Sequence, residues 1–478
     1  MKKHVLLIAL AAGVFATACK KEKEASGADD RGLTAGTINT PCTGAFGPVD
    51  LPEIISGNRT LSNDTIYLLD GKTWVKNGTL TIEPGTVIRG VKKATAADAS
   101  ALIVTTGALI NAQGTETCPI VFTSNEATPA PGDWGGVVIL GNAEICTPSG
   151  TAQIEGITAA PAGVTYTYGG TTADATSGVF SYVRIEYAGA VIIEGNELNG
   201  LTLGGVGCGT KLDHVATYYG ADDGFEFFGG NVNAKYLLAV ANNDDQFDFD
   251  FGYRGSLQFL VSIIDPAAAY AANNSNGIES DGGTVVTNPE RICHTRPVIS
   301  NMTIVGAEGS TTSPLLYGAR VRVNSHIVFR NSIITGYPAA GITLESAHSI
   351  ASNAGTANDT CRSAVDSTYI FDDIVETSGT TEYLNVSPRH SSAAIAANPG
   401  NIGLNGPFST TMSDYFDSFS QLLAPSTTPA TLPGRFCGLS PVACSTVFSF
   451  NTVSWKGGAL DAAGNYWLSD SWLQFSGY

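Results

Sequence analysis

Short runs in which apolar and polar residues alternate recur along most of the chain. Three examples are "TLTIEPGTVIRG" from Thr79, "SYVRIEYAG" from Ser181 and "DGFEFFGG" from Asp223. A period of two places alternate side chains on opposite faces of a strand, so one face is buried and the other faces outward. Gly, Asn and Asp between the runs are typical of turns. The pattern predicts many short strands.

The order of these strands predicts a solenoid. No amphipathic helix separates them, which argues against a sheet built from strand–helix–strand units. A similar strand returns roughly every 20 to 30 residues, a period typical of repeat architectures. Parallel strands that stack coil on coil bury a continuous core. We therefore expect an all-β parallel β-helix with an N-terminal cap and an irregular C-terminal capping segment.

The composition supports this fold class, and the net charge argues against nucleic acid as a partner. The chain has 478 residues, of which 55 are Gly, and only 14% are charged. Gly lowers helix stability by about 1 kcal/mol relative to Ala, so this composition favours strands and turns. The formal net charge of −18 gives no electrostatic attraction to phosphates, so we expect no nucleic-acid partner.

The N-terminus has the features of an export signal. Lys2 and Lys3 precede an apolar run and then small residues before Cys19, which predicts a signal peptide over residues 1–18. The sequence "ATAC" resembles the lipobox of bacterial lipoproteins, with Ala16 where Leu is usual. The resemblance implies that Cys19 is lipidated and that the outer membrane is a partner. Residues 19–40 are expected to be a flexible tether. Their acidic stretch resembles the signal of surface lipoproteins and favours the extracellular face.

The remaining chain divides into three segments. We expect an N-terminal cap over 41–78, the β-helix over 79–382, and a C-terminal cap with covering loops over the Pro-rich segment 383–478. An even number of Cys follows Cys19, which favours disulfides in an exported protein. The sequence leaves their pairing open, and Cys437 with Cys444 is the most plausible local pair.

Two coils repeat carboxylates and phenylalanines with one spacing. In "DDGFEFF" and "DDQFDFDF" the Phe share one face of each strand and the carboxylates share the other. Stacked rings inside the solenoid gain burial, so we expect the Phe inside and the carboxylates outside. "NGIESDGG" adds a third coil. Glu226, Asp248 and Glu279 are then expected to form one outward column, and Asp222 and Asp244 a second.

Stacked carboxylates repel one another by about 3 kcal/mol per pair at about 5 Å in a dielectric of about 20. Bound Ca²⁺ would offset this repulsion, because Ca²⁺ prefers oxygen ligands. The alternative is a solvated acidic face without an ion. The candidate calcium ligands are the outward carboxylates of these three coils: Asp222, Glu226, Asp244, Asp248, Asp250, Glu279 and Asp281.

Several motifs resemble a family. "LTIEPGTVIRG", "PIVFTS", "GDWGGVVILGNA" and "YVRIEYAG" are similar to a set of Bacteroidetes exported right-handed parallel β-helix proteins. The resemblance extends from about Ile55 to the C-terminus, where "VSWKGGALDAAGNYWLSDSWLQF" is similar to their aromatic closing segment. It implies a right-handed coil and no particular activity.

Two functions remain open. The first is a lipid-anchored surface module, structural or binding, that presents its acidic face to a glycan or a partner protein. The second is a polysaccharide-cleaving enzyme, a glycoside hydrolase or lyase, because the acidic coils are loosely similar to those of polygalacturonases. That resemblance implies that the acid and base come from Asp222, Asp223, Asp244 and Asp245, and that Arg320 and Arg322 hold a uronate. The Gly-His-Gly stretch of polygalacturonases is absent, so the module is favoured.

Overall fold

The computed structural model describes the chain from its first strand to the segment near the C-terminus. It describes residues 46–193, 196–265, 268, 270, 275–282, 294–306, 315–323, 325–337, 340–346, 364–366, 369–370, 377–378, 381–384, 444, 448–451, 453 and 457–474. The expected signal peptide, Cys19 and the tether lie outside these residues. So does most of the segment 383–443.

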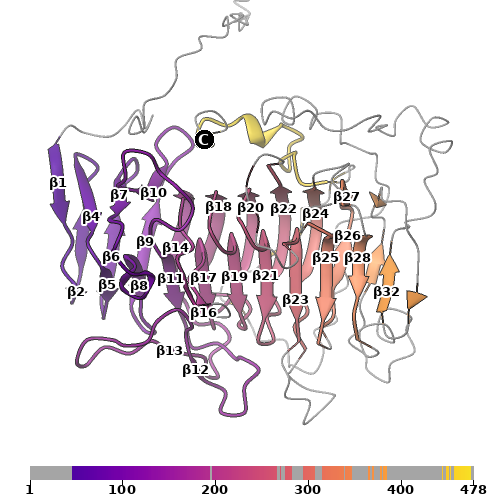
Figure 1. The fold of residues 1–478 in the computed structure, drawn as a ribbon, viewed down its shortest axis with the longest axis horizontal. Helices are drawn as coiled ribbons and strands as arrows, with labels where there is room; N and C mark the ends of the chain where they lie inside the picture. Colours follow the sequence, from indigo (N-terminus) through magenta and orange to yellow (C-terminus); the bar gives the residue numbers. More distant parts are fainter. Residues whose placement is uncertain are drawn as a thin grey trace, which may run out of the picture.

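Two long sheets extend along the long axis of the molecule, and their strands are stacked along this axis (Figure 1). The 16-stranded sheet, called sheet A, contains β1 (Phe46–Asp50), β3 (Arg59–Leu61), β4 (Thr65–Leu69), β6 (Thr79–Ile82), β7 (Val87–Gly90), β9 (Leu109–Gln113), β10 (Ile120–Ser124), β14 (Gly178–Glu186), β18 (Lys211–Tyr218), β20 (Asn233–Val240), β22 (Ser256–Ile263), β24 (Val298–Val305), β26 (Val328–Arg330), β27 (Ile333–Thr335), β29 (Ala364–Asp366) and β30 (Tyr369–Ile370). Along the main path of this sheet, from β1 through β4, β7 and β10 to β29, a strand of the other sheet lies in the chain between each strand and the next, as winding requires.

The 12-stranded sheet, called sheet B, supplies the opposite wall. It contains β2 (Ile54–Ile55), β5 (Lys72–Val75), β8 (Ala101–Val104), β11 (Gly136–Leu140), β17 (Leu201–Gly204), β19 (Phe225–Phe228), β21 (Phe247–Asp250), β23 (Ile278–Asp281), β25 (Tyr317–Arg322), β28 (Ala340–Leu344), β31 (Thr377–Ser378) and β32 (Thr381–Leu384). Its coils pair in parallel up to β28, and β32 then pairs antiparallel with β28 and β31. The predicted all-β parallel β-helix is confirmed.

The small elements lie outside the coils. β12 (Ala152–Gln153) pairs antiparallel with β13 (Thr167–Tyr168), and β15 (Val191–Ile193) with β16 (Asn196–Glu197). Single 3₁₀ turns occur at η1 (Ala96–Asp98) and η2 (Trp467–Ser469). Within the described residues, no helix has the length and apolar character needed to cross a bilayer.

The phenylalanine rungs lie in the interior, as predicted. Phe225 pairs in register with Phe247, and Phe227 with Phe249. The ring centroids are 4.9 Å apart in the first pair and 5.1 Å apart in the second, and all four side chains are fully buried. Stacking adds about 0.5–1.5 kcal/mol per pair to the hydrophobic gain. The rungs therefore fix the register of the coils that carry the acidic residues.

The motif "GDWGGVVILGNA" is explained by close packing. Trp134 is fully buried, stacks at 6.3 Å on Phe122, and donates its indole N–H to the Glu186 carbonyl. Gly136 has a φ of +108°, and a Cβ there would overlap the Asn199 carbonyl of the next coil. Only glycine fits this position, because the conformation and the close backbone both exclude a side chain.

The strands on either side of residue 78 belong to the same two sheets. Residues 46–75 supply strands β1 to β5, which pair with the coils that follow. Residues 457–474 lie along the outside of sheet A and pack on it through Trp467 and Trp472. The division at 41–78, 79–382 and 383–478 remains a prediction.

The expected local disulfide is wrong. Cys444 bonds to Cys208, which is 236 residues away in the sequence, and so cannot bond to Cys437. Cys118 and Cys146 are also disulfide-bonded. Sequence proximity favoured Cys437, but folding places Cys444 against the turn that follows β17. This bond attaches the C-terminal part of the chain to the middle of the solenoid.

Candidate functional site

One row of outward side chains crosses sheet B and changes its chemistry along the way. The paired positions, in order from β5 to β28, are Trp74, Ile103, Val138, Thr202, Glu226, Asp248, Glu279, Arg320 and Thr343. The row is apolar in the early coils, acidic in the middle and basic at Arg320. The predicted column of Glu226, Asp248 and Glu279 is thus in register. These three residues are called the acidic row.

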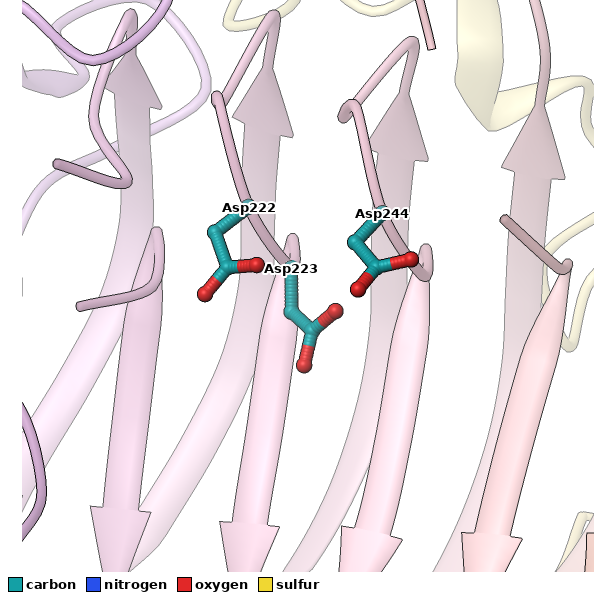
Figure 2. A group of neighbouring side chains, drawn as sticks. All are labelled: Asp222, Asp223 and Asp244. Atoms are coloured by element: carbon teal, nitrogen blue, oxygen red, sulfur yellow. The ribbon is translucent and has the colours of Figure 1, made fainter. Parts of the chain in front are cut away.

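A second acidic group lies in the turns just before β19 and β21. Asp222 and Asp244 take matching places on neighbouring coils, and the carboxylate of Asp223 lies between them (Figure 2). One oxygen of each of Asp222, Asp223 and Asp244 lies within 4.8 Å of the others. The same holds for Asp223, Glu226 and Asp248. Asp223 therefore joins the turn group to the acidic row.

Asp223 and Asp245 also hold the turns together. The Asp223 N–H donates to Asn199 Oδ1, at 3.2 Å, and the Asp245 N–H donates to Asp223 Oδ1, at 2.9 Å. The N–H of Asn276 donates to Asp245 Oδ1 at 2.6 Å. Each coil thus fixes the next through a side-chain oxygen, which satisfies backbone donors in the turns. This structural role accounts for Asp245, which is in neither group of clustered carboxylates.

The acidic groups are far less exposed than expected. Asp222, Asp223, Glu226 and Asp245 are only 9%, 7%, 5% and 4% exposed. Asp244, Asp248, Asp250, Glu279 and Asp281 are half-buried. The alternative of a solvated acidic face is therefore wrong for Asp222 and Glu226. They lie on the outer side of sheet B, but other parts of the chain cover them.

A long excursion between β11 and β14 provides the cover. Its residues Ile145, Ile154 and Tyr168 pack with Phe228 of β19 in an apolar cluster outside sheet B. The Cys146 N–H donates to the Phe251 carbonyl at 2.7 Å, and the Gly230 N–H to the Glu144 carbonyl at 2.8 Å. These contacts hold the excursion against the coils that carry the carboxylates.

The excursion and the adjoining hairpin add carboxylates that sequence reasoning missed. Glu155 and Glu197 are half-buried and interact electrostatically with Asp222, and Glu155 also does so with Glu226. Burial, followed by the charges of Glu197 and Asp250, raises the pKa of Glu155 to about 8. No local pattern distinguishes these two residues from ordinary loop acids. Only the fold brings them to the acidic row.

Burial is the main cause of large pKa shifts across the set. It raises the pKa values of Asp223, Glu226 and Asp248 well above their ordinary range, and neighbouring carboxylates add to each shift. The pKa of Asp222 is raised in the same way, first by burial and then by Asp244, and that of Asp245 by burial and Glu279. The cluster destabilises its own negative charge.

Asp244, Asp250 and Glu279 have smaller shifts. Burial raises the pKa of Asp244 to about 6, that of Asp250 to about 7, and that of Glu279 to about 7. Arg322 opposes the shift in all three cases, because its positive charge favours the ionised carboxylate. The set therefore favours protons or a compensating positive charge over uncompensated negative charge.

The two arginines are already engaged. Arg320 donates to both oxygens of Glu345, at 2.7 and 3.0 Å, and Arg322 donates to both oxygens of Asp281, at 2.9 and 2.6 Å. Arg322 also lies 3.0 Å from Glu279. The role expected for them in the enzyme hypothesis, holding a uronate, would require a substrate to displace these partners. They neutralise the β23–β28 end of the set and leave the β19–β21 end without an arginine partner in the described ion pairs.

Comparison with known families agrees with the fold. A family model described as a pectate-lyase-like β-helix domain matches residues 53–406. The chain therefore belongs to the pectate-lyase-like β-helix family. Searches of curated proteins and of solved structures found no match. The family defines the architecture and assigns no role to the acidic set.

Proposed function

We propose that this protein is an exported, lipid-anchored β-helix module whose covered acidic set binds divalent cations, with Ca²⁺ the best candidate. One observation carries the proposal. Two groups of carboxylates, which share Asp223, each place their oxygens within 4.8 Å of one another. In addition, Asp248 Oδ1 is buried and has no hydrogen-bond partner. Oxygen ligands at this density match the coordination that Ca²⁺ requires.

Charge balance supports a cation at the β19–β21 end. Burial of ionised carboxylates is unfavourable unless a positive charge or a donor compensates. Arg320 and Arg322 bond to Glu345, Asp281 and Glu279, all of which lie on later coils. A divalent cation between Asp222, Asp223 and Asp244 would neutralise the carboxylates that the arginines do not pair with. The shared position of Asp223 supports a second cation with Glu226 and Asp248.

Calcium is expected to stabilise the protein, and a chelator is expected to destabilise it. At free Ca²⁺ about 100 times the dissociation constant, binding to the folded state adds about 2.7 kcal/mol to the free energy of unfolding. Denaturant unfolding in Ca²⁺ and in a chelator measures this difference. Isothermal titration with Ca²⁺ alone should give two sites, because the carboxylates form two groups, which have Asp223 in common.

The variant Asp248→Asn gives the sharpest control. It keeps the shape of the side chain and removes one charge from the repelling set. Without Ca²⁺ it should be at least as stable as the wild type. It should lose the part of the calcium response that comes from the group of Asp223, Glu226 and Asp248, and keep the part that comes from the group of Asp222, Asp223 and Asp244. The matched variant Asp98→Asn removes an exposed carboxylate in turn η1 that belongs to neither group, and it should retain the full response. An unchanged unfolding midpoint in Ca²⁺ and in chelator would reject the calcium site.

Anchoring and location rest on the sequence. We propose that Cys19 is lipidated, that the module is displayed on the outer face of the outer membrane, and that its ligand is a glycan or a surface protein. The variant Cys19→Ala should then be absent from the membrane fraction. Protease added outside intact cells should cleave the wild type. Retention of the variant in the membrane, or protection of the wild type, would argue against this location.

A polysaccharide-cleaving enzyme is the second candidate. The family match and the nearness of Arg320 and Arg322 to Glu279 and Asp281 favour it. The engaged arginines and the structural role of Asp245 count against it. Assays on polygalacturonate and alginate with and without Ca²⁺ decide between the candidates. Turnover that is lost in Asp222→Asn and Asp244→Asn would establish the enzyme.

A further inference from the structure

The excursion between β11 and β14 is fixed to the coils near both of its ends. At its start, the Gly230 N–H donates to the Glu144 carbonyl at 2.8 Å. At its return, Thr106 of the turn after β8 donates through its hydroxyl to the Thr167 carbonyl at 2.8 Å. The part between these contacts, residues 147–166, carries β12 and leads into β13 (Figure 1), and it is called the flap. The flap is thus a loop between two fixed ends.

Packing sets the position of one carboxylate on the flap. Ile154 of the flap and Leu198, which follows β16, belong to the same buried apolar cluster outside sheet B. Gly156 has a φ of 65°, and a Cβ there would lie only 2.4 Å from the Glu197 carbonyl oxygen and 2.6 Å from the Leu198 side chain. Glu155 lies between these two packed residues in the chain. Its place beside the hairpin β15–β16 is therefore a consequence of close packing.

The flap brings negative charge to a set of carboxylates. Glu155 is the only charged residue among residues 147–166, so the flap provides no lysine or arginine. Glu155 interacts electrostatically with Glu197, Asp222 and Glu226. Like charges repel strongly where burial excludes water. Closure of the flap over the acidic set therefore gains apolar burial but adds repulsion, which a cation on the set would offset.

We propose that the flap is a lid latched by the bound cation: a divalent cation on the acidic set holds the flap closed, and its removal lets the flap open more often. The inference rests on the proposed function, because it assumes a cation in that set. The cation lies on the coil side, between the oxygens of Asp222, Asp223 and Asp244. Glu155 belongs to neither group of clustered oxygens, so it acts through its charge on the closed flap.

This arrangement links two equilibria. A cation that favours the closed flap is itself bound more tightly when the flap is closed, because thermodynamic coupling between two events is reciprocal. Such coupling typically changes an affinity by about 5- to 150-fold. The buried contacts of Ile154 and the contact of Tyr166 with Trp74, at 6.4 Å between ring centroids, remain without the cation. Cation removal should therefore increase local opening and leave the coils folded.

Hydrogen exchange resolved by peptide tests the latch in the full-length protein, in Ca²⁺ and in a chelator at the same pH. Exchange of peptides within the flap should be roughly five- to twentyfold slower in Ca²⁺. Peptides within 457–474 provide the reference, because they also lie outside the coils but pack on sheet A. They should change clearly less. Isothermal titration of the same sample with Ca²⁺ reports binding independently of the flap.

The variant Glu155→Gln separates charge from packing. It keeps the shape of the side chain and removes the one charge of the flap. In chelator its flap should exchange more slowly than that of the wild type, because the repulsion is smaller. The difference between Ca²⁺ and chelator should fall to about threefold or less. Loss of packing would instead speed exchange in both conditions. The variant Glu53→Gln, at an exposed position on the first coil, should keep the wild-type difference.

The outcomes distinguish the latch from the cation site. If titration shows that Ca²⁺ binds while flap exchange is the same in Ca²⁺ and in chelator, the latch is rejected and the cation site stands. A full calcium difference in Glu155→Gln would likewise overturn the latch. If titration shows no binding of Ca²⁺, the proposed function fails and the latch fails with it.

Discussion

The variant Phe247→Ala is expected to lower the free energy of unfolding by about 3–5 kcal/mol, the range for truncating a buried Phe. Phe247 is fully buried and stacks on Phe225 at 4.9 Å with the rings only 4° from parallel. Truncation leaves a cavity and removes a ring partner from the interior of the solenoid. Denaturant unfolding followed by circular dichroism measures the loss.

The control Phe247→Leu keeps most of the apolar volume and should lose clearly less, by about 1–2 kcal/mol. The two variants should also differ in their effect on the acidic row. Asp248 follows Phe247 on the same strand and points to the opposite face, so a loosened rung should also weaken the calcium response. A loss of less than about 1 kcal/mol in the alanine variant would mean that the ring is not part of the core.

The variant Trp472→Ala is expected to release residues 457–474, called the strap, from the outer face of sheet A. Trp472 is fully buried, stacks on Trp467, and contacts Tyr182 and His214 edge-on. Truncation of a buried Trp costs about 3–5 kcal/mol. Because the strap lies outside the main core, this loss should appear as local opening. Peptides within 457–474 should then exchange quickly, while those of β8 and β11 remain protected.

The same variant should expose apolar surface on sheet A. Leu238, Val261 and Val305 pack against the strap, so its release should increase the binding of a hydrophobic dye. The conservative variant Trp472→Phe should retain most of the protection. If Trp472→Ala leaves the strap protected, then the hydrogen bonds of Arg184 and Gly458 hold it without the indole, and the apolar cluster on the outer face of sheet A is not what docks it.

These expectations link the stability of the solenoid to its proposed function. The interior rungs set the register of the coils, and this register aligns Glu226, Asp248 and Glu279. The excursion between β11 and β14 then covers these carboxylates. A cation or protons must then offset the repulsion between the carboxylates. The strap performs a similar task on sheet A, where it covers apolar residues that would otherwise face water.

The fold and part of the site were predictable because they depend on local alternation. The parity of "DGFEFF" and "QFDFDF" places Phe on one face and carboxylates on the other in any strand. The spacing of the repeats then predicts which carboxylates share a row. The close match between the predicted column and the observed pairing of Glu226, Asp248 and Glu279 follows from this arithmetic.

Other features of the site could not be predicted, since they depend on contacts between distant segments. Glu155 and Glu197 reach the acidic set from an excursion and a hairpin whose sequences have no distinctive pattern. The pairing of Arg320 and Arg322 with acidic partners depends on the order of later coils. Cys444 bonds to Cys208 and not to its neighbour in sequence, because the fold brings together two segments that are 236 residues apart.

The sequence by itself determined the class of fold, the buried phenylalanine rungs and the outward direction of the acidic row. Each of these follows from the alternation of side chains along single strands, which is a local property of the sequence. Only the tertiary structure decided that the acidic row is covered, that its carboxylates favour protons or cations, and that the strap closes over His214. The physical reason is that burial and charge environment are properties of assembled surfaces, which no local pattern specifies.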